Sequence, residues 1–417
     1  MEQLGERIKR LRKERKMTLA DVAGNRLTKG MLSLIENGKA NPSMESLQYI
    51  ASQLRIDTSE LVQSNENNSL REVLLQAENI GQELSSTFSK EKEEELKQQL
   101  LQLIKPLLED GYLNGNTYEE ARLFEIYYRT LYLTTGELDN TQFERLAIMY
   151  EKLHAFSRTL KVYSAMCVAD FNNRNFEQAL NILLEGEKKL QQYEYFIDDL
   201  EKLDFYYNIM VIYAALNNEK KAEHYINLAL EISKKKKVFY RISDFYRFIF
   251  YVHLQKNEND KCHYYLEKIK LLAELMEDPL ELMTKDILVL TYYNYVTKEY
   301  EKVLQYEIPE ERLEIIGGAA AFLNTQKGIA YYQLQQYTEA FNAVKELSIP
   351  EFSNHPIDLS ILYEGFAIRA LCRFELNDVE EAKRDILYAY DGIKDFADTI
   401  NKQFIMKSYE KIMNTKL

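Results

Sequence analysis

The sequence contains no tryptophan and only three cysteines among its 417 residues. The cysteines, Cys167, Cys262 and Cys372, are odd in number, widely spaced and each set in an apolar helical context. This pattern indicates neither a disulfide framework nor a CxxC metal site. We expect all three to be small buried hydrophobic side chains.

Long apolar runs are also missing. No stretch approaches the roughly 18 uncharged apolar residues that a membrane span needs, and the N-terminal segment MEQLGERIKRLRKERK lacks the apolar region of a signal peptide. We therefore expect a cytoplasmic protein without membrane contact.

Residues that carry catalysis are sparse. The five histidines show no metal-ligand or nucleophile spacing, and neither of the glycine patterns that bind phosphate, GxGxxG and GxxxxGK followed by Ser or Thr, occurs. We predict that the protein is not an enzyme and has no catalytic residue, no metal ligand and no cofactor.

The net charge of -13 is divided unevenly along the chain. Residues 1–62 hold eleven Lys or Arg and eight Asp or Glu, whereas the remaining residues hold 42 basic and 58 acidic side chains. An acidic body repels phosphate, so this asymmetry favours a nucleic-acid contact made by the N-terminal module alone.

Residues 1–62 are predicted to form five short helices. Leu4, Ile8 and Leu11 share one face of the first helix, and short helices LADVA and KGMLSLIEN follow. The residues expected to open or close the later helices are Thr18, Thr28, Gly38, Pro42 with Ser43, and Asp57. The expected core consists of Leu11, Val22, Ala23, Leu32, Ile35, Leu47, Ile50 and Leu61.

The second and third of these helices have the spacing of a helix-turn-helix, whose second helix enters the DNA major groove. Side chains at its start and in the loop after it can bind phosphates or base edges, or can simply cap helices and face solvent. The predicted DNA-binding residues are Thr18, Arg26, Thr28, Lys29, Gly30, Ser33, Lys39 and Asn41. We expect Glu36 to pair with an Arg or Lys inside the bundle instead.

The segments MTLADVA, LTKGMLSLIENGKANPS and SLQYIASQLRIDTSELV resemble the Xre and Cro-like repressor class, which implies DNA binding. Leu19 stands where this class has glutamine after the first threonine, and the turn between the two helices is one residue shorter. The resemblance therefore implies DNA binding but does not indicate which bases are preferred.

The rest of the chain is predicted to be all-helical, which makes the whole protein all-α. We expect a helix-turn-helix domain at 1–63, a linker at 64–70 around the polar segment SNENNS, and a repeat domain at 71–417. Six four-residue blocks match the tetratricopeptide pattern, and their last residues lie 43, 40, 41, 37 and 42 positions apart. The blocks begin at Phe176, Glu219, Asn259, Tyr300, Tyr337 and Val379.

About eight lengthened helix pairs should therefore stack into a right-handed superhelix with a concave groove. Gly328 and Tyr331 precede the block at Tyr337, where glycine permits close helix packing. Such a groove suits extended peptides or partner helices, although a repeat body can also serve as a rigid spacer.

A helix-turn-helix ahead of a long tetratricopeptide body resembles the peptide-pheromone receptors of Gram-positive bacteria, the group that contains Rap, Rgg, NprR, PrgX and PlcR. The NprR type is the most similar, on the text KGMLS and IENGKANPS and on total length. The resemblance implies a secreted, processed and reimported oligopeptide, activation of extracellular protease genes, and a second role in sporulation through a phosphorelay protein.

Polar residues that interrupt apolar first helices are candidates for the peptide site. Asparagine can clamp the N–H and C=O groups of an extended peptide, and arginine can bind its carboxylate. Asn208, in DFYYNIMVIYAALNN, resembles the asparagine that members of this group place in the groove. The predicted peptide-binding residues are Arg129, Asn208, Arg247, Asn294 and Gln326, each of which could instead belong to a solvated helix face.

Two functions follow as hypotheses. The first is a quorum-sensing transcriptional regulator, switched by an imported oligopeptide, that binds paired half-sites of promoter DNA as a dimer or tetramer. The alternative is a protein-interaction regulator whose repeats bind a phosphorelay response regulator and modulate sporulation.

Overall fold

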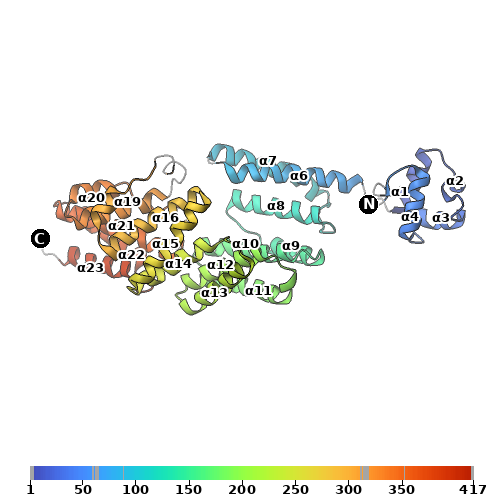
Figure 1. The fold of residues 1–417 in the computed structure, drawn as a ribbon. Helices are drawn as coiled ribbons and strands as arrows, with labels where there is room; N and C mark the ends of the chain where they lie inside the picture. The colour runs from blue at the N-terminus through green and yellow to red at the C-terminus, as the bar shows by residue number, and fades with distance from the viewer. Residues whose placement is uncertain are drawn as a thin grey trace. The chain divides into compact units, whose positions relative to one another are not determined.

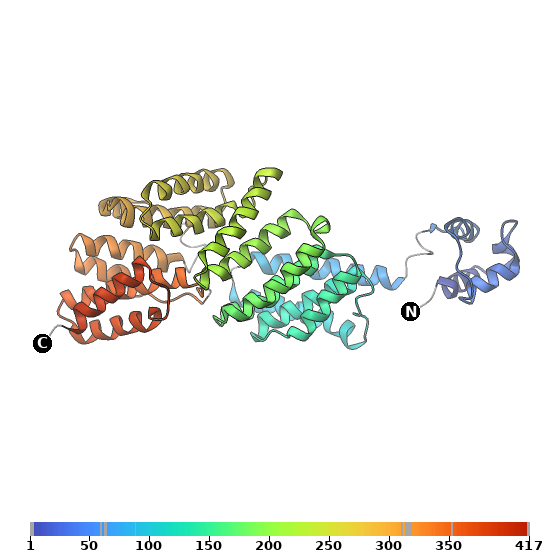
Figure 2. The same cartoon turned by 90° about the horizontal axis from the view of Figure 1, so that it is seen from below.

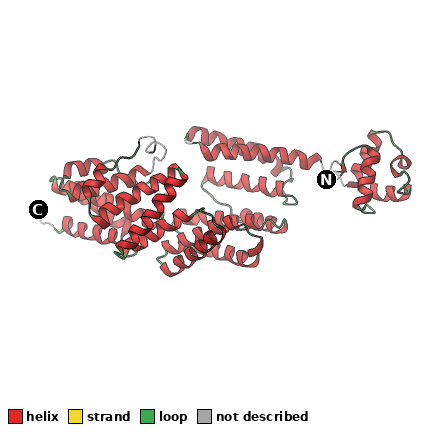
Figure 3. Cartoon of the chain, viewed as in Figure 1, coloured by secondary structure: helices red, strands yellow, loops and turns green. Residues whose placement is uncertain are grey.

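The computed structural model describes the chain except residues 1–3, 59–60, 62–64, 88, 310–311, 313–318, 352 and 415–417. All regular structure among the described residues is helical, so the predicted all-α class is confirmed (Figure 3). None of the described helices is both long and apolar enough to cross a membrane. The chain divides into two compact units, Met1–His154 and Ala155–Leu417.

The first unit begins with a small bundle of short helices. The described helices of this bundle are α1 (Leu4–Glu14), α2 (Leu19–Ala23), α3 (Lys29–Glu36) and α4 (Met44–Leu54). Thr18 and Thr28 cap α2 and α3 as predicted, because each side chain accepts a hydrogen bond from the first turn. Gly38 follows α3 with a φ of 67°, the left-handed region that favours glycine.

The sequence predicted that Pro42 and Ser43 open the fourth helix, but Pro42 is not part of it. Ser43 is the N-cap, since its hydroxyl accepts a hydrogen bond from the Ser46 amide, so α4 begins at Met44 and Pro42 lies before it. The last predicted turn begins after Asp57, but most of its residues lie outside the described part of the chain.

The core of this bundle agrees with the prediction at seven of eight positions, from Val22 to Leu61. The exception is Leu11, which is only partly buried and packs against the core from its edge. Ile8, one turn earlier on α1, fills the centre and is fully buried. The core also contains Ala51 and Leu54, which the prediction did not include.

The rest of the first unit consists of α6 (Asn65–Ser86), α7 (Lys90–Glu109), α8 (Tyr118–Thr135) and α9 (Asn140–Lys152). Helix α6 begins at Asn65, so most of the predicted linker, residues 64–70, is helical. The predicted domain boundary lies inside the first unit and stays a prediction.

The second unit continues the series of helices (Figure 1). Its described elements are α10 (Phe156–Asn172), α11 (Phe176–Gln192), the 3₁₀ turn η1 (Glu194–Phe196), α12 (Asp199–Ala215), α13 (Glu219–Lys236), α14 (Ile242–Gln255), α15 (Asn259–Met276), α16 (Pro279–Tyr292), the π-helical turn η2 (Tyr293–Thr297), α17 (Tyr300–Gln305), α19 (Ala319–Gln333), α20 (Tyr337–Val344), α21 (Pro356–Glu375), α22 (Val379–Ile393) and α23 (Ile400–Met413). The last three helices lie side by side in both views (Figure 1 and Figure 2).

All six predicted blocks begin the second helix of a helix pair. Their first residues are the first residues of α11, α13, α15, α17, α20 and α22. The last residue of each block is fully buried, and these residues are Ala179, Ala222, Cys262, Val303, Ala340 and Ala382. A small or medium side chain at this position lets the two helices of a pair pack closely. Gly328 on α19 does the same, because an added Cβ would lie 2.5 Å from Val344 Cγ1.

Every one of these six turns contains a residue in the left-handed backbone region, two positions before the second helix. The φ angles of these residues lie between 54° and 67°. In the typical case the next amide donates to the carbonyl five residues earlier, as Asn218 N does to Tyr213 O at 2.8 Å, which ends the first helix. The six residues are Arg174, Asn217, Asn257, Lys298, Gln335 and Asn377.

A buried polar cluster joins η2, α21 and α23. The Glu364 carboxylate is 2% exposed and accepts hydrogen bonds from the Tyr295 hydroxyl and the Asn401 amide, both at 2.5 Å. Burial raises the pKa of Glu364 to about 7, although both hydrogen bonds favour the charged form. Around neutral pH, then, this carboxyl lies close to its own titration midpoint.

Replacing Glu364 with glutamine should change how stability depends on pH. Between the ordinary carboxyl pKa near 4.5 and about 7, the folded state keeps a proton that the unfolded state has released, so stability falls as pH rises through this range. Glu364→Gln removes this loss, which amounts to at most about 3 kcal/mol. We expect the variant's advantage in thermal unfolding to be larger at pH 8 than at pH 5, and parallel curves would contradict this.

Candidate functional sites

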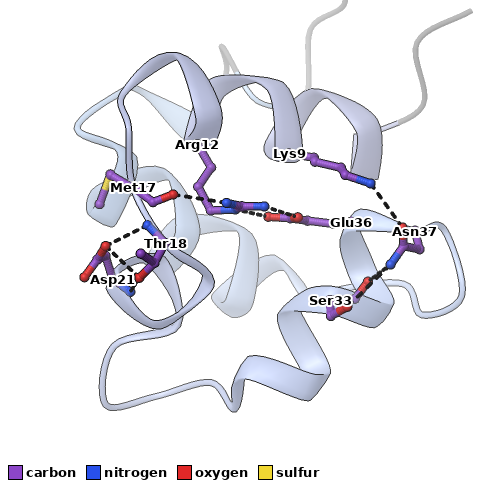
Figure 4. Close-up of polar contacts among 8 residues, drawn as sticks. All are labelled: Lys9, Arg12, Met17, Thr18, Asp21, Ser33, Glu36 and Asn37. Atoms are coloured by element: carbon purple, nitrogen blue, oxygen red, sulfur yellow. Dashed lines mark hydrogen bonds and ion pairs between the residues drawn. The ribbon is translucent and has the colours of Figure 1, made fainter.

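A bidentate ion pair anchors α3 to α1 (Figure 4). Arg12 Nε lies 2.6 Å from Glu36 Oε1, and Arg12 Nη2 lies 2.8 Å from Glu36 Oε2. Arg12 Nη1 also donates to the Met17 carbonyl at 3.0 Å. Glu36 is only 3% exposed, so the prediction that it pairs inside the bundle is confirmed. The pair sets the orientation of α3 against the bundle.

A second polar chain runs along the C-terminal end of α3 (Figure 4). Lys9 Nζ donates to Asn37 Oδ1 at 3.4 Å, and Asn37 Nδ2 donates to the Ser33 carbonyl at 2.7 Å and to its hydroxyl at 3.4 Å. The Ser33 hydroxyl therefore keeps its own proton available for an outside acceptor. Asn37, in contrast, is engaged at both ends of its amide.

The predicted DNA-binding residues divide by their contacts. The hydroxyls of Thr18 and Thr28 are engaged in helix caps, with the Thr18 hydroxyl also 2.7 Å from Asp21 Oδ2. Arg26 is 66% exposed and lies 3.6 Å from Glu45. The exposed members on α3 and the loop after it are Lys29, Gly30, Lys39 and Asn41.

Two apolar residues on α3 are unusually exposed for their type, and neither was among the predicted DNA-binding residues. Met31 is 48% exposed and Leu34 is 45% exposed, although the bundle buries Leu32 and Ile35 of the same helix. The signal was present in KGMLSLIE, where four large apolar residues exceed what one face of a two-turn helix can bury.

A cavity with a volume of about 600 Å³ lies in the second unit. Its wall comes from helices and turns between Arg174 and Asn401, so residues far apart in sequence meet there. Apolar side chains such as Phe248 and Ile361 alternate with polar ones. The polar groups include those of Gln326, Thr291 and Tyr295, which gives the mixed composition that ligand sites have.

Two smaller cavities, of about 200 and 160 Å³, adjoin the same helices. Tyr251 of α14 lines all three cavities, and Arg247, one turn earlier, lines both smaller ones with Asp358. Arg247 Nη2 is 3.5 Å from Asp244 Oδ1 and 3.4 Å from the Tyr207 hydroxyl. Its side chain remains 38% exposed, so part of it is accessible from solvent.

His355 stands in the wall of the second cavity in a defined tautomer. Its Nδ1 accepts from the Ile357 amide at 3.2 Å, so Nε2 carries the proton and donates to the Val211 carbonyl at 3.2 Å. Burial lowers the pKa of His355, which keeps the ring neutral. The histidine therefore shapes the cavity without adding charge.

The structure brings two of the predicted peptide-binding residues directly together. Asn294 Nδ2 donates to the Gln326 side-chain oxygen at 2.8 Å and to the Gln326 backbone carbonyl at 2.9 Å. Both side chains are at least 96% buried, and only Gln326 lines the large cavity. Neither Asn294 Oδ1 nor Gln326 Nε2 has a hydrogen-bond partner, so this buried pair keeps one free acceptor and one free donor.

The other two candidates lie elsewhere. Asn208 is partly buried on α12 and lines none of the three cavities, because its neighbours Tyr207 and Met210 hold the positions that face the second one. Arg129 belongs to the first unit, where its Nε lies 3.0 Å from the buried Glu125. Its contact is consistent with a structural role.

The three cysteines are buried and unpaired, as predicted. Within the described residues, no group of three His, Cys, Asp or Glu side chains is arranged to hold a metal ion.

Comparison with known proteins gives matches to one family model and to solved structures. No curated protein matches the chain. A solved structure of Bacillus thuringiensis PlcR in complex with the peptide PapR7 and DNA is 19% identical, with a TM-score of 0.34, and covers 66% of this chain and 99% of that one. The Streptococcus dysgalactiae SHP pheromone receptor Rgg2 is 16% identical, with a TM-score of 0.30, over 69% and 98% of the two chains.

A third similar structure is a signal transduction ATPase with numerous domains from Pyrococcus horikoshii, which has a tetratricopeptide repeat sensor. It is 14% identical, with a TM-score of 0.40, and covers 99% of this chain and 72% of that one. The family model described as Helix-turn-helix matches residues 8–61, which contain most of α1 and all of α2, α3 and α4. The chain therefore carries a helix-turn-helix domain of this family at residues 8–61, ahead of its helical repeats.

Proposed function

We propose that this protein is a transcriptional regulator that binds promoter DNA through its helix-turn-helix and responds to an oligopeptide bound among its repeats. The observation that carries the proposal is the combination of a basic helix-turn-helix with three adjoining cavities that share Tyr251. Several cavities that share a lining residue suit an extended chain of several residues better than a compact metabolite.

The DNA contact is assigned to the exposed surface at α3. Lys29 supplies positive charge at the start of this helix, and Gly30 leaves the backbone accessible. In the loop after the helix, Lys39 supplies positive charge and Asn41 supplies hydrogen bonds. Thr18 and Thr28 act chiefly as caps that hold the two helices in register. Arg26 and Ser33 keep donors free for phosphate or bases.

The peptide contact is assigned to the cavities of the second unit. Arg247 would bind a ligand carboxylate, and Gln326 would offer its free Nε2 donor to a peptide carbonyl. Asn294 positions Gln326 through their hydrogen bonds. For Asn208 and Arg129, the structure offers no support for a ligand contact.

Regulation requires that the peptide binds one arrangement of the protein better than another. We propose that two copies act together, since helix-turn-helix domains commonly read paired half-sites about one helical turn apart. The resemblance to peptide-pheromone receptors makes an imported signalling peptide the expected ligand. Nothing among the described residues favours the alternative, a repeat body that binds a response regulator.

Replacing Lys29 with alanine should weaken DNA binding uniformly across sequences. Loss of one phosphate contact should reduce the slope of log affinity against log salt by about one for each bound copy. Lys29 is exposed, so thermal stability should change little. Lys188→Ala, which removes a lysine that is 69% exposed in the second unit, is the matched control and should leave the slope unaltered.

Replacing Gly30 with alanine should separate stability from DNA binding. An added Cβ would meet only Thr28 Oγ1, at 3.9 Å, so alanine fits and should stabilise α3 by up to about 1 kcal/mol. The same methyl group should hinder close approach to DNA and lower affinity. Gly81→Ala in α6, where a Cβ would meet nothing within 4 Å, is the control that should stabilise without affecting DNA. Unchanged affinity in Gly30→Ala would remove this residue from the interface.

Replacing Arg247 with glutamine should abolish recognition of a peptide carboxylate. The test uses a peptide selected from a random library by the full chain, prepared with a free carboxylate and as its amide. We expect the native chain to prefer the carboxylate by about tenfold or more, and Arg247→Gln to bind both forms equally. Lys256→Gln, on an exposed lysine just after α14, should retain the preference. Equal binding of both peptides by the native chain would contradict the assignment.

A further inference from the structure

The outward face of α3 is predominantly apolar, which is unusual for a surface that meets a polyanion. With about 100° between successive residues, the buried residues Leu32, Ile35 and Glu36 lie on one side of the helix, and Gly30 and Leu34 lie opposite them. Leu34 is therefore directed away from the bundle, with 45% of its surface exposed.

The polar groups on this helix are largely engaged within the protein. The Thr28 hydroxyl caps α3, and both ends of the Asn37 amide are held by Lys9 and Ser33. Because these groups are occupied, few side chains remain to form the bidentate hydrogen bonds with which Asn, Gln or Arg identify a base. Ser33 retains one hydroxyl proton, which is a weaker means of discrimination.

Gly30 has no side chain, so the helix backbone next to Leu34 is exposed. It lies one turn before Leu34 on the same face, and an added Cβ there would meet only one protein atom within 4 Å. The glycine is therefore not required by packing inside the protein, and it lowers the stability of the helix. An apolar side chain next to an unobstructed strip of backbone suits close contact with a flat surface outside the protein.

Basic residues stand around this strip. Lys29 lies at the start of α3, Lys39 lies in the loop after it, and Arg26 lies in the turn before it, all of them exposed. Such a frame of cations matches phosphates on both sides of a groove, while the apolar centre matches the one apolar group that DNA displays in the major groove, the 5-methyl group of thymine. The charge pattern thus favours DNA over an apolar protein partner as the occupant.

We propose that Leu34, with Met31 beside it, reads thymine 5-methyl groups, and that these contacts determine much of the sequence specificity. The inference rests on the proposed DNA binding and adds to it the chemical group that is recognised. Met31 is 48% exposed and lies about 60° around the helix from Leu34, so the two side chains can meet methyl groups on neighbouring base pairs. Apolar contact of this kind requires no group that is already engaged.

The experiment uses the full chain and a duplex selected with it from a random DNA library. Each thymine in the enriched site is replaced in turn by uracil, which removes only the methyl group. We expect at least one replacement in each half-site to lower affinity by about fourfold, the value of one buried methyl group. In a weaker duplex that has cytosine in place of such a thymine, replacing this cytosine by 5-methylcytosine should restore part of the lost affinity.

The variant Leu34→Ala links the effect to the side chain. It should bind the thymine duplex more weakly, bind the thymine and uracil duplexes equally, and unfold at nearly the native temperature, since alanine is a good helix former. Leu75→Ala, on a leucine of α6 that is 59% exposed, is the matched control and should keep the native discrimination.

The possible outcomes separate this inference from the proposed function. Enrichment of a duplex that is insensitive to uracil, or discrimination that persists in Leu34→Ala, would overturn methyl recognition while leaving DNA binding intact. Met31→Ala reports separately on the second side chain. Failure to enrich any duplex would contradict DNA binding itself and this inference with it.

Discussion

The repeat body depends on a close approach between the two helices of each pair. The fourth residue of each second helix, such as Ala179 or Ala340, is fully buried where the helices meet. The turn before it reverses the chain in a few residues, which requires a left-handed backbone at one position. Helices that leave such a turn are already packed against each other, so each pair forms a unit that the next pair can cover.

The same constraint creates the cavities. First helices are held in a row by their partners, so side chains on successive first helices, such as Arg247 of α14 and Thr291 of α16, line neighbouring parts of one wall. The π-helical turn after α16 interrupts this regularity and brings Asn294 against Gln326. This irregular turn thus positions Gln326, whose Nε2 has no partner, in the wall of the 600 Å³ cavity, in agreement with the tendency of such turns to occur at functional positions.

In the N-terminal bundle the corresponding constraint is electrostatic. Arg12 and Glu36 are largely withdrawn from water, and each satisfies the other with two hydrogen bonds. The pair leaves Glu36 unable to repel DNA phosphates, and it fixes the side of α3 that turns outward. The apolar residue Leu34 and the bare backbone at Gly30 consequently face solvent, and the predicted contacts with DNA follow from that orientation.

The sequence by itself determined the helical class, the caps of α2 and α3, most of the bundle core and the first residue of six second helices. These features are local, because each depends on residues only a few positions apart. Examples are a hydroxyl before a helix, a repeated apolar spacing and a small residue at a fixed offset. Glu36 was also assigned correctly to the interior. The exposure of Met31 and Leu34 was not predicted. When a short helix has apolar residues on several faces, its sequence alone does not indicate which face the bundle covers.

Only the tertiary structure decided which polar residues of the repeats line a cavity. Asn208 and Arg247 have the same signature in sequence, a polar residue within an apolar first helix, yet only Arg247 faces the cavities. The difference is the direction in which each side chain faces around its helix axis, and packing against neighbouring helices sets that direction. Asp358 lines the two smaller cavities with Arg247, more than 100 positions away in the sequence, and no local pattern contains that information.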